Sequence, residues 1–140
     1  MFDYFYGIGD DVDGVDLNRN YDFNWIFGDD FQQVDTGCSA NPSYLSNFDY
    51  YRGPAPFSEP EIQAMKYFSE NNEFKIALNY HSYGNLFIYP WGYDYSIFTP
   101  DSAIFAEYAK IMTQKNNYTY GTGDQTVGYV ANGVSDDWMY

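Results

Sequence analysis

His81 is the only histidine of this 140-residue chain, and its position makes it the first candidate for chemistry. It follows residues 76–80, whose mostly apolar and partly β-branched sequence predicts a strand. The end of a buried strand is where α/β sheets place their chemistry. A neutral imidazole there can bind zinc, but a catalytic zinc needs three protein ligands and the sequence offers no second histidine. From spacing alone, a structural histidine is the favoured interpretation, and a zinc ligand is the alternative.

Asn18 and Arg19 form the second candidate site. They follow residues 14–17, whose alternating apolar and polar side chains predict a short strand. A planar guanidinium can donate two parallel hydrogen bonds to a carboxylate, and a neighbouring amide can add a third. The pair therefore suits a carboxylate ligand, with an ordinary surface arginine as the alternative. The only other arginine is Arg52.

Composition excludes several classes of protein. The formal charge is −14, from 6 Lys and Arg against 20 Asp and Glu, so a nucleic-acid partner is excluded for want of a cationic footprint. Hydrophobic residues make up 45% and aromatic residues 23% of the chain, which favours one globular unit. No apolar run is long enough to cross a membrane, and the first residues lack the basic stretch of an export signal.

Three further features of the sequence give no strong indication of a functional site. Cys38 is the single cysteine, so it cannot form an internal disulfide and is expected to be a buried or half-buried small apolar residue. Asn117-Tyr118-Thr119 fits the glycosylation pattern, but a three-residue match is expected by chance. The acidic run 10–16 fails the EF-hand register and is expected to be a solvated loop, with an irregular calcium site as the alternative.

The remaining pattern predicts helices that alternate with short strands. Residues 21–57 lack periodicity and are predicted to form long loops. Ser58-Glu59-Pro60-Glu61 has the pattern of a capping box, which predicts a helix that ends at Asn71-Asn72. A second strand is predicted over 85–89, a helix from 100–102 to 116–117, and a last helix capped at 135–137. Together these elements indicate an α/β architecture.

Four blocks of the sequence share the order of a known family. They are GVDLNRNY at 14–21, YRGP through FSEPE at 51–61, NYHSY followed by YPWGY at 79–93, and Tyr129 with residues 133–140. With these blocks the chain resembles the zinc metallocarboxypeptidases of the carboxypeptidase A/B type. The resemblance implies an α/β fold with a mixed central sheet flanked by helices. Residues 1–140 are then expected to be the central to C-terminal part of one catalytic domain, truncated at both ends.

The resemblance also implies a zinc site that this chain holds only in part. His81 corresponds to the third zinc ligand of the family, which follows a central strand. The first two ligands of the family lie in a His-x-x-Glu motif upstream, and its catalytic glutamate lies downstream. Neither is in these 140 residues. In the family, zinc lowers the pKa of its bound water and polarises the peptide carbonyl.

Substrate-binding roles follow from the same resemblance. Asn18 and Arg19 correspond to the pair that binds the terminal carboxylate of the substrate, in agreement with the argument from their chemistry. Tyr129 corresponds to the mobile tyrosine that closes over the bound C-terminus and is counted with the catalytic residues. Ser82 and Tyr83 correspond to residues of the neighbouring substrate subsite.

Asp136 is expected to decide specificity. It aligns with the floor of the primary pocket, where an acidic side chain in B-type enzymes receives Lys or Arg. A helix-capping acidic residue is the alternative, because Ser135-Asp136-Asp137 also suits a helix N-terminus. The resemblance further implies cis peptide bonds at Ser82-Tyr83 and Pro90-Trp91.

The sequence therefore predicts a zinc-dependent exopeptidase that removes C-terminal Lys or Arg from peptides. The 140-residue chain is expected to be an inactive portion of it. The expected partners are peptide or protein C-termini, the expected state is a monomer, and secretion or a periplasmic location follows from the resemblance alone. The alternative is a non-catalytic module of related fold, which binds peptide C-termini or, through its aromatic residues, carbohydrate.

Overall fold

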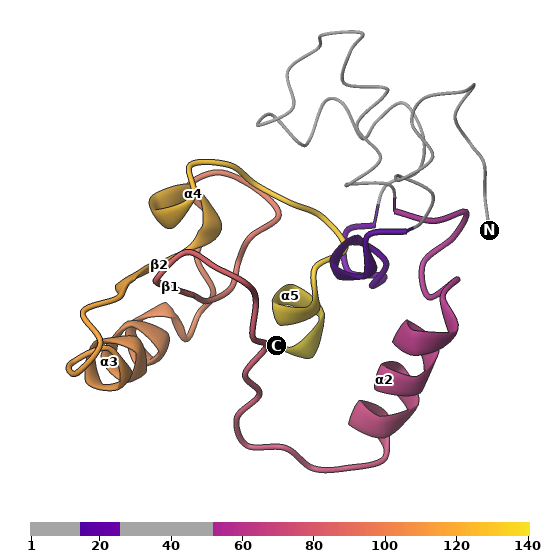
Figure 1. Ribbon diagram of the computed structural model, residues 1–140, viewed down its shortest axis with the longest axis horizontal. Coiled ribbons are helices and arrows are strands. Elements are labelled where there is room, and N and C mark those ends of the chain that lie inside the picture. Colours follow the sequence, from indigo (N-terminus) through magenta and orange to yellow (C-terminus); the bar gives the residue numbers. More distant parts are fainter. Residues whose placement is uncertain (1–14, 26–51) are drawn as a thin grey trace, which may run out of the picture.

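The computed structural model describes residues 15–25 and 52–140 of the chain (Figure 1). Cys38 and most of the acidic run and of the long loop lie outside these residues. In chain order the elements are the 3-10 helix η1 (Leu17–Arg19), α2 (Pro60–Glu70), β1 (Leu86–Ile88), α3 (Ser102–Met112), β2 (Thr119–Gly121), α4 (Gly123–Thr126) and α5 (Ser135–Met139). Within this part of the chain, no helix is both long and apolar enough to cross a membrane.

Strands β1 and β2 pair in parallel, with α3 between them in the chain. Leu86 lies opposite Thr119, and Ile88 lies opposite Gly121. Parallel neighbours cannot be joined by a tight turn, so a crossover such as α3 is required. The predicted strand at 85–89 and the α/β class are therefore confirmed. In Figure 1 the strands and α3 lie on the left, α2 on the right, and α5 between them.

Helix α2 is confirmed, but its predicted capping box is wrong. The N-cap is Glu59 rather than Ser58, and no side chain of the helix caps it. The reason is Asn20, a fully buried residue from the N-terminal segment. Its amide nitrogen donates to Ser58 Oγ at 2.9 Å, and its amide oxygen accepts from the Glu59 N–H at 3.2 Å. A long-range contact thus takes the place of the local one.

Neither of two predicted strands is present among the described residues. Residues 15–16 run without regular structure into η1, because the Asp16 carboxylate accepts from the Asn18 N–H at 2.9 Å and favours a turn. Residues 76–80 have no strand neighbour in the described ranges. The side chains of Ile76, Leu78 and Tyr80 are 65%, 44% and 91% exposed.

The two later helices begin near their predicted starts. Helix α3 ends at Met112, earlier than predicted, and the Thr113 hydroxyl donates to the Ala109 carbonyl at 2.8 Å at its end. Helix α5 is confirmed, but its N-cap is Val134, so Ser135 is the first helical residue rather than the cap. A capping box that the sequence analysis missed begins α4, between Thr122 and Gln125.

The N-terminal segment is held against the segment that precedes α5. The Tyr21 N–H donates to the Gly133 carbonyl at 3.0 Å, and the Gly133 N–H donates to the Phe23 carbonyl at 3.2 Å. The Tyr21 ring packs against Phe57 and Trp138, with centroids 6.0 and 5.3 Å away. These contacts fix η1, which carries Asn18 and Arg19, beside the start of α5.

Candidate substrate-binding site

Asn18 joins η1 to the first turn of α5. Its side-chain oxygen accepts a hydrogen bond from the Ser135 N–H at 2.9 Å. A helix N-terminus has free N–H groups that need such an acceptor. Because Oδ1 is engaged, the Nδ2 group is the part of the amide that can donate to a ligand. No hydrogen bond joins Nδ2 to another described residue.

Arg19 is buried beside Asn18. Its Nη1 donates to the Asn18 carbonyl at 2.9 Å and lies 3.8 Å from a carboxylate oxygen of Asp16. Only 6% of Arg19 is exposed. These contacts hold the guanidinium in one place, which is the requirement for directed recognition of a carboxylate. The alternative of an ordinary surface arginine is thereby excluded.

Asp136 lies in the first turn of α5 and is half-buried. Burial raises the pKa of its carboxyl group. The N–H groups of its own helix turn, the His81 imidazole and the Arg19 guanidinium oppose that rise. Asp136 therefore lies within electrostatic reach of both His81 and Arg19. A cationic ligand group beside Asp136 would favour the ionised form of its carboxyl group and pair with it.

Asp137 is an almost fully buried neighbour, 2% exposed. Its two carboxylate oxygens accept from the Gly92 N–H at 2.8 and 3.1 Å. Burial, together with the charge of Asp136, raises its pKa to about 7, and backbone N–H groups of Gly92 and Tyr93 oppose the rise. The two adjacent carboxyl groups therefore differ in role. Asp137 binds the backbone of another segment, whereas Asp136 interacts with the charges of His81 and Arg19.

His81 is exposed at the end of the extended segment 76–80. The described residues contain no group of three His, Cys, Asp or Glu side chains that could hold a metal ion. One imidazole fits a single ligand position of a catalytic zinc, which needs three protein ligands, and cannot hold the ion alone. Two residues before His81, the Asn79 side chain donates to Ser135 Oγ at 3.0 Å. This hydrogen bond joins the segment that carries His81 to α5.

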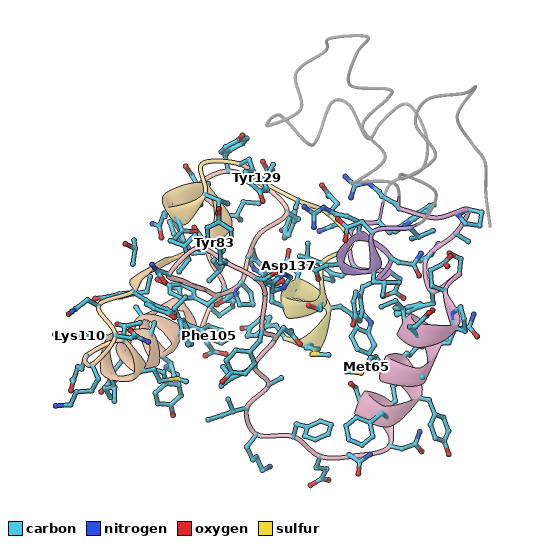
Figure 2. The ribbon with its side chains drawn as sticks, viewed as in Figure 1. Met65, Tyr83, Phe105, Lys110, Tyr129 and Asp137 are labelled. Carbon is cyan, nitrogen blue, oxygen red and sulfur yellow. The ribbon has the colours of Figure 1, made fainter. Side chains whose placement is uncertain are left out.

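The other predicted site residues are less closely joined to this group. Ser82 is exposed and Tyr83 is 100% exposed. Tyr129 is half-buried, and within the described ranges no hydrogen bond or ring contact links its side chain to Asn18 or His81. In Figure 2, Tyr83 and Tyr129 lie toward the upper part of the view, and Asp137 lies near its centre beside α5. The predicted cis peptide bonds at 82–83 and 90–91 are present.

Sequence reasoning missed the residues that hold the site together. Asn20 and Asp137 are both buried, and both bond backbone groups of distant segments. Gly133 has a φ of +67°, and a Cβ there would lie 2.5 Å from the Arg19 carbonyl oxygen. The only signal available in the sequence was the presence of these residues within the four blocks. Their partners, 32 to more than 100 residues away, follow no local pattern.

Known proteins match nearly the whole of this chain in sequence. The family model described as zinc carboxypeptidase matches residues 8–140. Carboxypeptidase A6 of Mus musculus is 34% identical over 91% of this chain and 28% of its own length. Carboxypeptidase B of Rattus norvegicus is 36% identical over 91% of this chain and 29% of its own length. The chain therefore spans less than a third of the length of these relatives.

A solved structure shows the same fold. Bovine thrombin-activatable fibrinolysis inhibitor, in complex with a tick carboxypeptidase inhibitor, superposes with a TM-score of 0.69 and 30% sequence identity, over 91% of this chain and 42% of that one. The family match covers nearly all of the chain, including every predicted site residue. The chain belongs to the zinc carboxypeptidase family.

Proposed function

We propose that this chain is the substrate-recognition part of a zinc-dependent exopeptidase that removes C-terminal Lys or Arg from peptides. Asn18 and Arg19 bind the terminal carboxylate, and Asp136 receives the cationic side chain. The observation that carries the proposal is the joining of these residues at one place. Asn18 is bonded to the residue just before Asp136, and Asp136 is electrostatically coupled to Arg19.

The arrangement is chemically matched to a C-terminal lysine or arginine. Such a residue carries a carboxylate and a cation a few bonds apart, and the site offers a guanidinium with an amide donor next to a half-buried carboxylate. A terminal amide in place of the carboxylate would lose the charge-assisted hydrogen bonds to Arg19. An uncharged side chain would leave the Asp136 carboxylate without its counter-charge.

The remaining predicted residues complete the proposal. Tyr129 closes over the bound C-terminus, and Ser82 and Tyr83 line the next subsite. His81 is one of three zinc ligands, and the other two come from segments that are not among these 140 residues. Hydrolysis itself depends on groups outside this chain, so the 140-residue chain alone binds peptides without cleaving them.

We also propose that residues 1–140 are the central to C-terminal part of a single catalytic domain. The apolar side chains of Ile76, Leu78 and Tyr80 are exposed along an extended segment, as expected for a strand whose neighbours lie elsewhere in the domain. The length of the relatives is in keeping with this. A monomeric, secreted or periplasmic protein is proposed on the family relationship.

Binding of matched peptides to the 140-residue chain tests recognition directly. Three peptides of one sequence are titrated by calorimetry: one ends in free Lys, one in free Phe and one in Lys amide. We expect the Lys peptide to bind at least about tenfold more tightly than each of the others, which is about 1.4 kcal/mol. Asp136→Asn removes the preference for Lys over Phe, whereas Asp101→Asn, at the exposed N-cap of α3, keeps it.

Cleavage is tested in the protein extended by its flanking coding sequence. The extension is expected to supply a His-x-x-Glu motif upstream and a glutamate downstream. Release of C-terminal Lys well above release of C-terminal Phe supports the proposal. Equal rates for the two substrates contradict the role of Asp136. Peptide binding without any cleavage by the extended protein favours the non-catalytic binding module instead.

A further inference from the structure

Gly92 is held from two sides by one segment of the chain. Its N–H donates to both oxygens of the Asp137 carboxylate, at 2.8 and 3.1 Å. Its carbonyl accepts from the Ala131 N–H at 2.9 Å. We call these bonds, together, the Gly92 clamp. The Asp137 side of the clamp has two accepting oxygens, whereas the Ala131 side has a single hydrogen bond.

The clamp lies where three segments meet. A Cβ at Gly92 would lie 3.7 Å from each Asp137 carboxylate oxygen and 3.8 Å from Val134 Cγ2. A Cβ at Gly123, the first residue of α4, would lie 3.2 Å from the Tyr129 carbonyl oxygen and 3.8 Å from the Gly92 Cα. The segment after β1, the start of α4 and residues 129–137 therefore pack backbone against backbone.

The same stretch carries two residues of the proposed site. Tyr129 precedes Ala131 by two residues, and Asp136 precedes Asp137 by one. The two ends of the clamp, at Ala131 and Asp137, thus hold the stretch in place close to each of these residues. A shift of Gly92 would move them relative to one another, and displacements of about 1 Å in a positioned site can cost about 100-fold.

A carboxyl group is an expensive acceptor for backbone N–H groups in a buried place. Its charge must be desolvated, and Asp136 next to it adds repulsion. A neutral amide would satisfy the Gly92 N–H at lower cost. What Asp137 supplies beyond packing is an acceptor with two oxygens that fixes Gly92 in one position.

From this geometry we infer that Asp137 is a positioning residue for the proposed site: through Gly92 it sets where Asp136 and Tyr129 lie. The inference rests on the proposed function, because the position matters only if those residues bind a peptide. It adds to that function a residue that touches no substrate and yet controls selectivity.

Two measurements on the 140-residue chain test the inference. Hydrogen exchange of segments 89–93 and 128–132 reports the clamp without any peptide. The ratio of affinities for peptides ending in Lys and in Phe reports the position of the site. Asp137→Ala is expected to raise exchange in both segments and to lower the ratio by about tenfold. Asp137→Asn keeps an oxygen that accepts from the Gly92 N–H and is expected to restore most of the ratio.

The matched control is Asp94→Ala, at an exposed aspartate that accepts from the Tyr95 N–H beside it. It should change neither measurement. If Asp137→Ala does not fold, Asp137→Glu takes its place, because its longer side chain displaces Gly92 while it keeps the charge. It should show the same pattern.

Three distinguishable results would contradict the clamp, the positioning role of Asp137 or the proposed function, respectively. Unchanged exchange in Asp137→Ala contradicts the clamp. Raised exchange with an unchanged affinity ratio contradicts the positioning role and leaves the proposed function standing. A wild-type chain that binds none of the peptides contradicts the proposed function and, with it, the positioning role, while the exchange data still show whether the clamp exists.

Discussion

The side-chain oxygen of Asn18 accepts the Ser135 N–H across 117 positions of sequence, at 2.9 Å. One amide therefore has two separate tasks. Its oxygen satisfies the first turn of α5, and its nitrogen remains as a donor for a ligand. The two tasks can be separated by substitution, because they use different atoms of the same group.

Replacement of Asn18 by Asp and by Ala separates stability from binding. Asn18→Asp keeps an oxygen for the Ser135 N–H, so the free energy of unfolding in urea should stay within about 0.5 kcal/mol of wild type. Asn18→Ala removes the acceptor of the Ser135 N–H and should cost about 1 kcal/mol, as the loss of a capping side chain does. Both variants lose the Nδ2 donor, and both should bind the Lys-ending peptide at least about tenfold more weakly. Tight binding by Asn18→Asp would show that Nδ2 does not contact the carboxylate.

The sequence was sufficient to predict elements with strong local signals. Helix α2 and helix α3 begin near residues whose types favour a helix start, and β1 follows from three apolar residues in a row. The capping box at Ser58 was wrong because Asn20, 38 residues away, occupies that hydroxyl. Local sequence patterns predict only bonds between residues that are close in the chain. They cannot predict where a distant residue, such as Asn20, takes the place of a local hydrogen-bond partner.

The site residues were found in a different way. No periodicity leads to Asn18, Arg19, His81 and Asp136 together, and only their chemistry and the order of the four blocks pointed to them. The structure brings Asn18, Arg19 and Asp136 into one group through long-range bonds and charges. The role of Asp137 was not predicted, because its partner is a backbone N–H 45 residues away. Every residue except proline has such an N–H, so no residue type marks the partner in the sequence.

Gly133 should tolerate no side chain, and Gly128 provides its matched control. Both have positive φ, +67° and +80°, but a Cβ at Gly133 would lie 2.5 Å from the Arg19 carbonyl oxygen, whereas nothing lies within 4 Å of one at Gly128. Gly128→Ala should cost about 1 kcal/mol for the backbone conformation alone. Gly133→Ala should cost about 3 kcal/mol or more, because backbone atoms must also move. Urea unfolding of both variants measures the difference, and equal costs would show that the close approach is easily relieved.

Tyr129→Phe tests whether the phenol hydroxyl contributes to binding. The variant keeps the ring, so its unfolding free energy should match that of wild type. Loss of one hydrogen bond to the bound carboxylate should weaken the Lys-ending peptide about threefold to tenfold. The amidated peptide, which lacks that carboxylate, should bind the variant and wild type alike. A variant that binds both peptides as wild type does would remove Tyr129 from the site.

The buried Asp137 should make the protein more stable in mild acid than at neutral pH. Its pKa is 3.8 ordinarily and about 7 in the folded chain, because burial and the charge of Asp136 disfavour ionisation. Below pH 3.8 the carboxyl group is protonated in both states. Between these two values only the unfolded chain has released the proton, so the folded chain binds more protons and the free energy of unfolding falls as pH rises. The slope contributed by this group is at most about 1.4 kcal/mol per pH unit, and it disappears above about pH 7.

Asp137→Asn isolates that contribution, because its side chain does not titrate and still offers an oxygen to Gly92. Urea unfolding of the variant and of wild type should therefore give curves that diverge as pH rises through this window, with the variant the more stable of the two near neutral pH. Asp136, whose pKa is also raised by burial, remains in both proteins and cancels from the difference. Parallel curves across the window would mean that Asp137 releases its proton at the same pH in the folded and unfolded chains, and that burial does not raise its pKa.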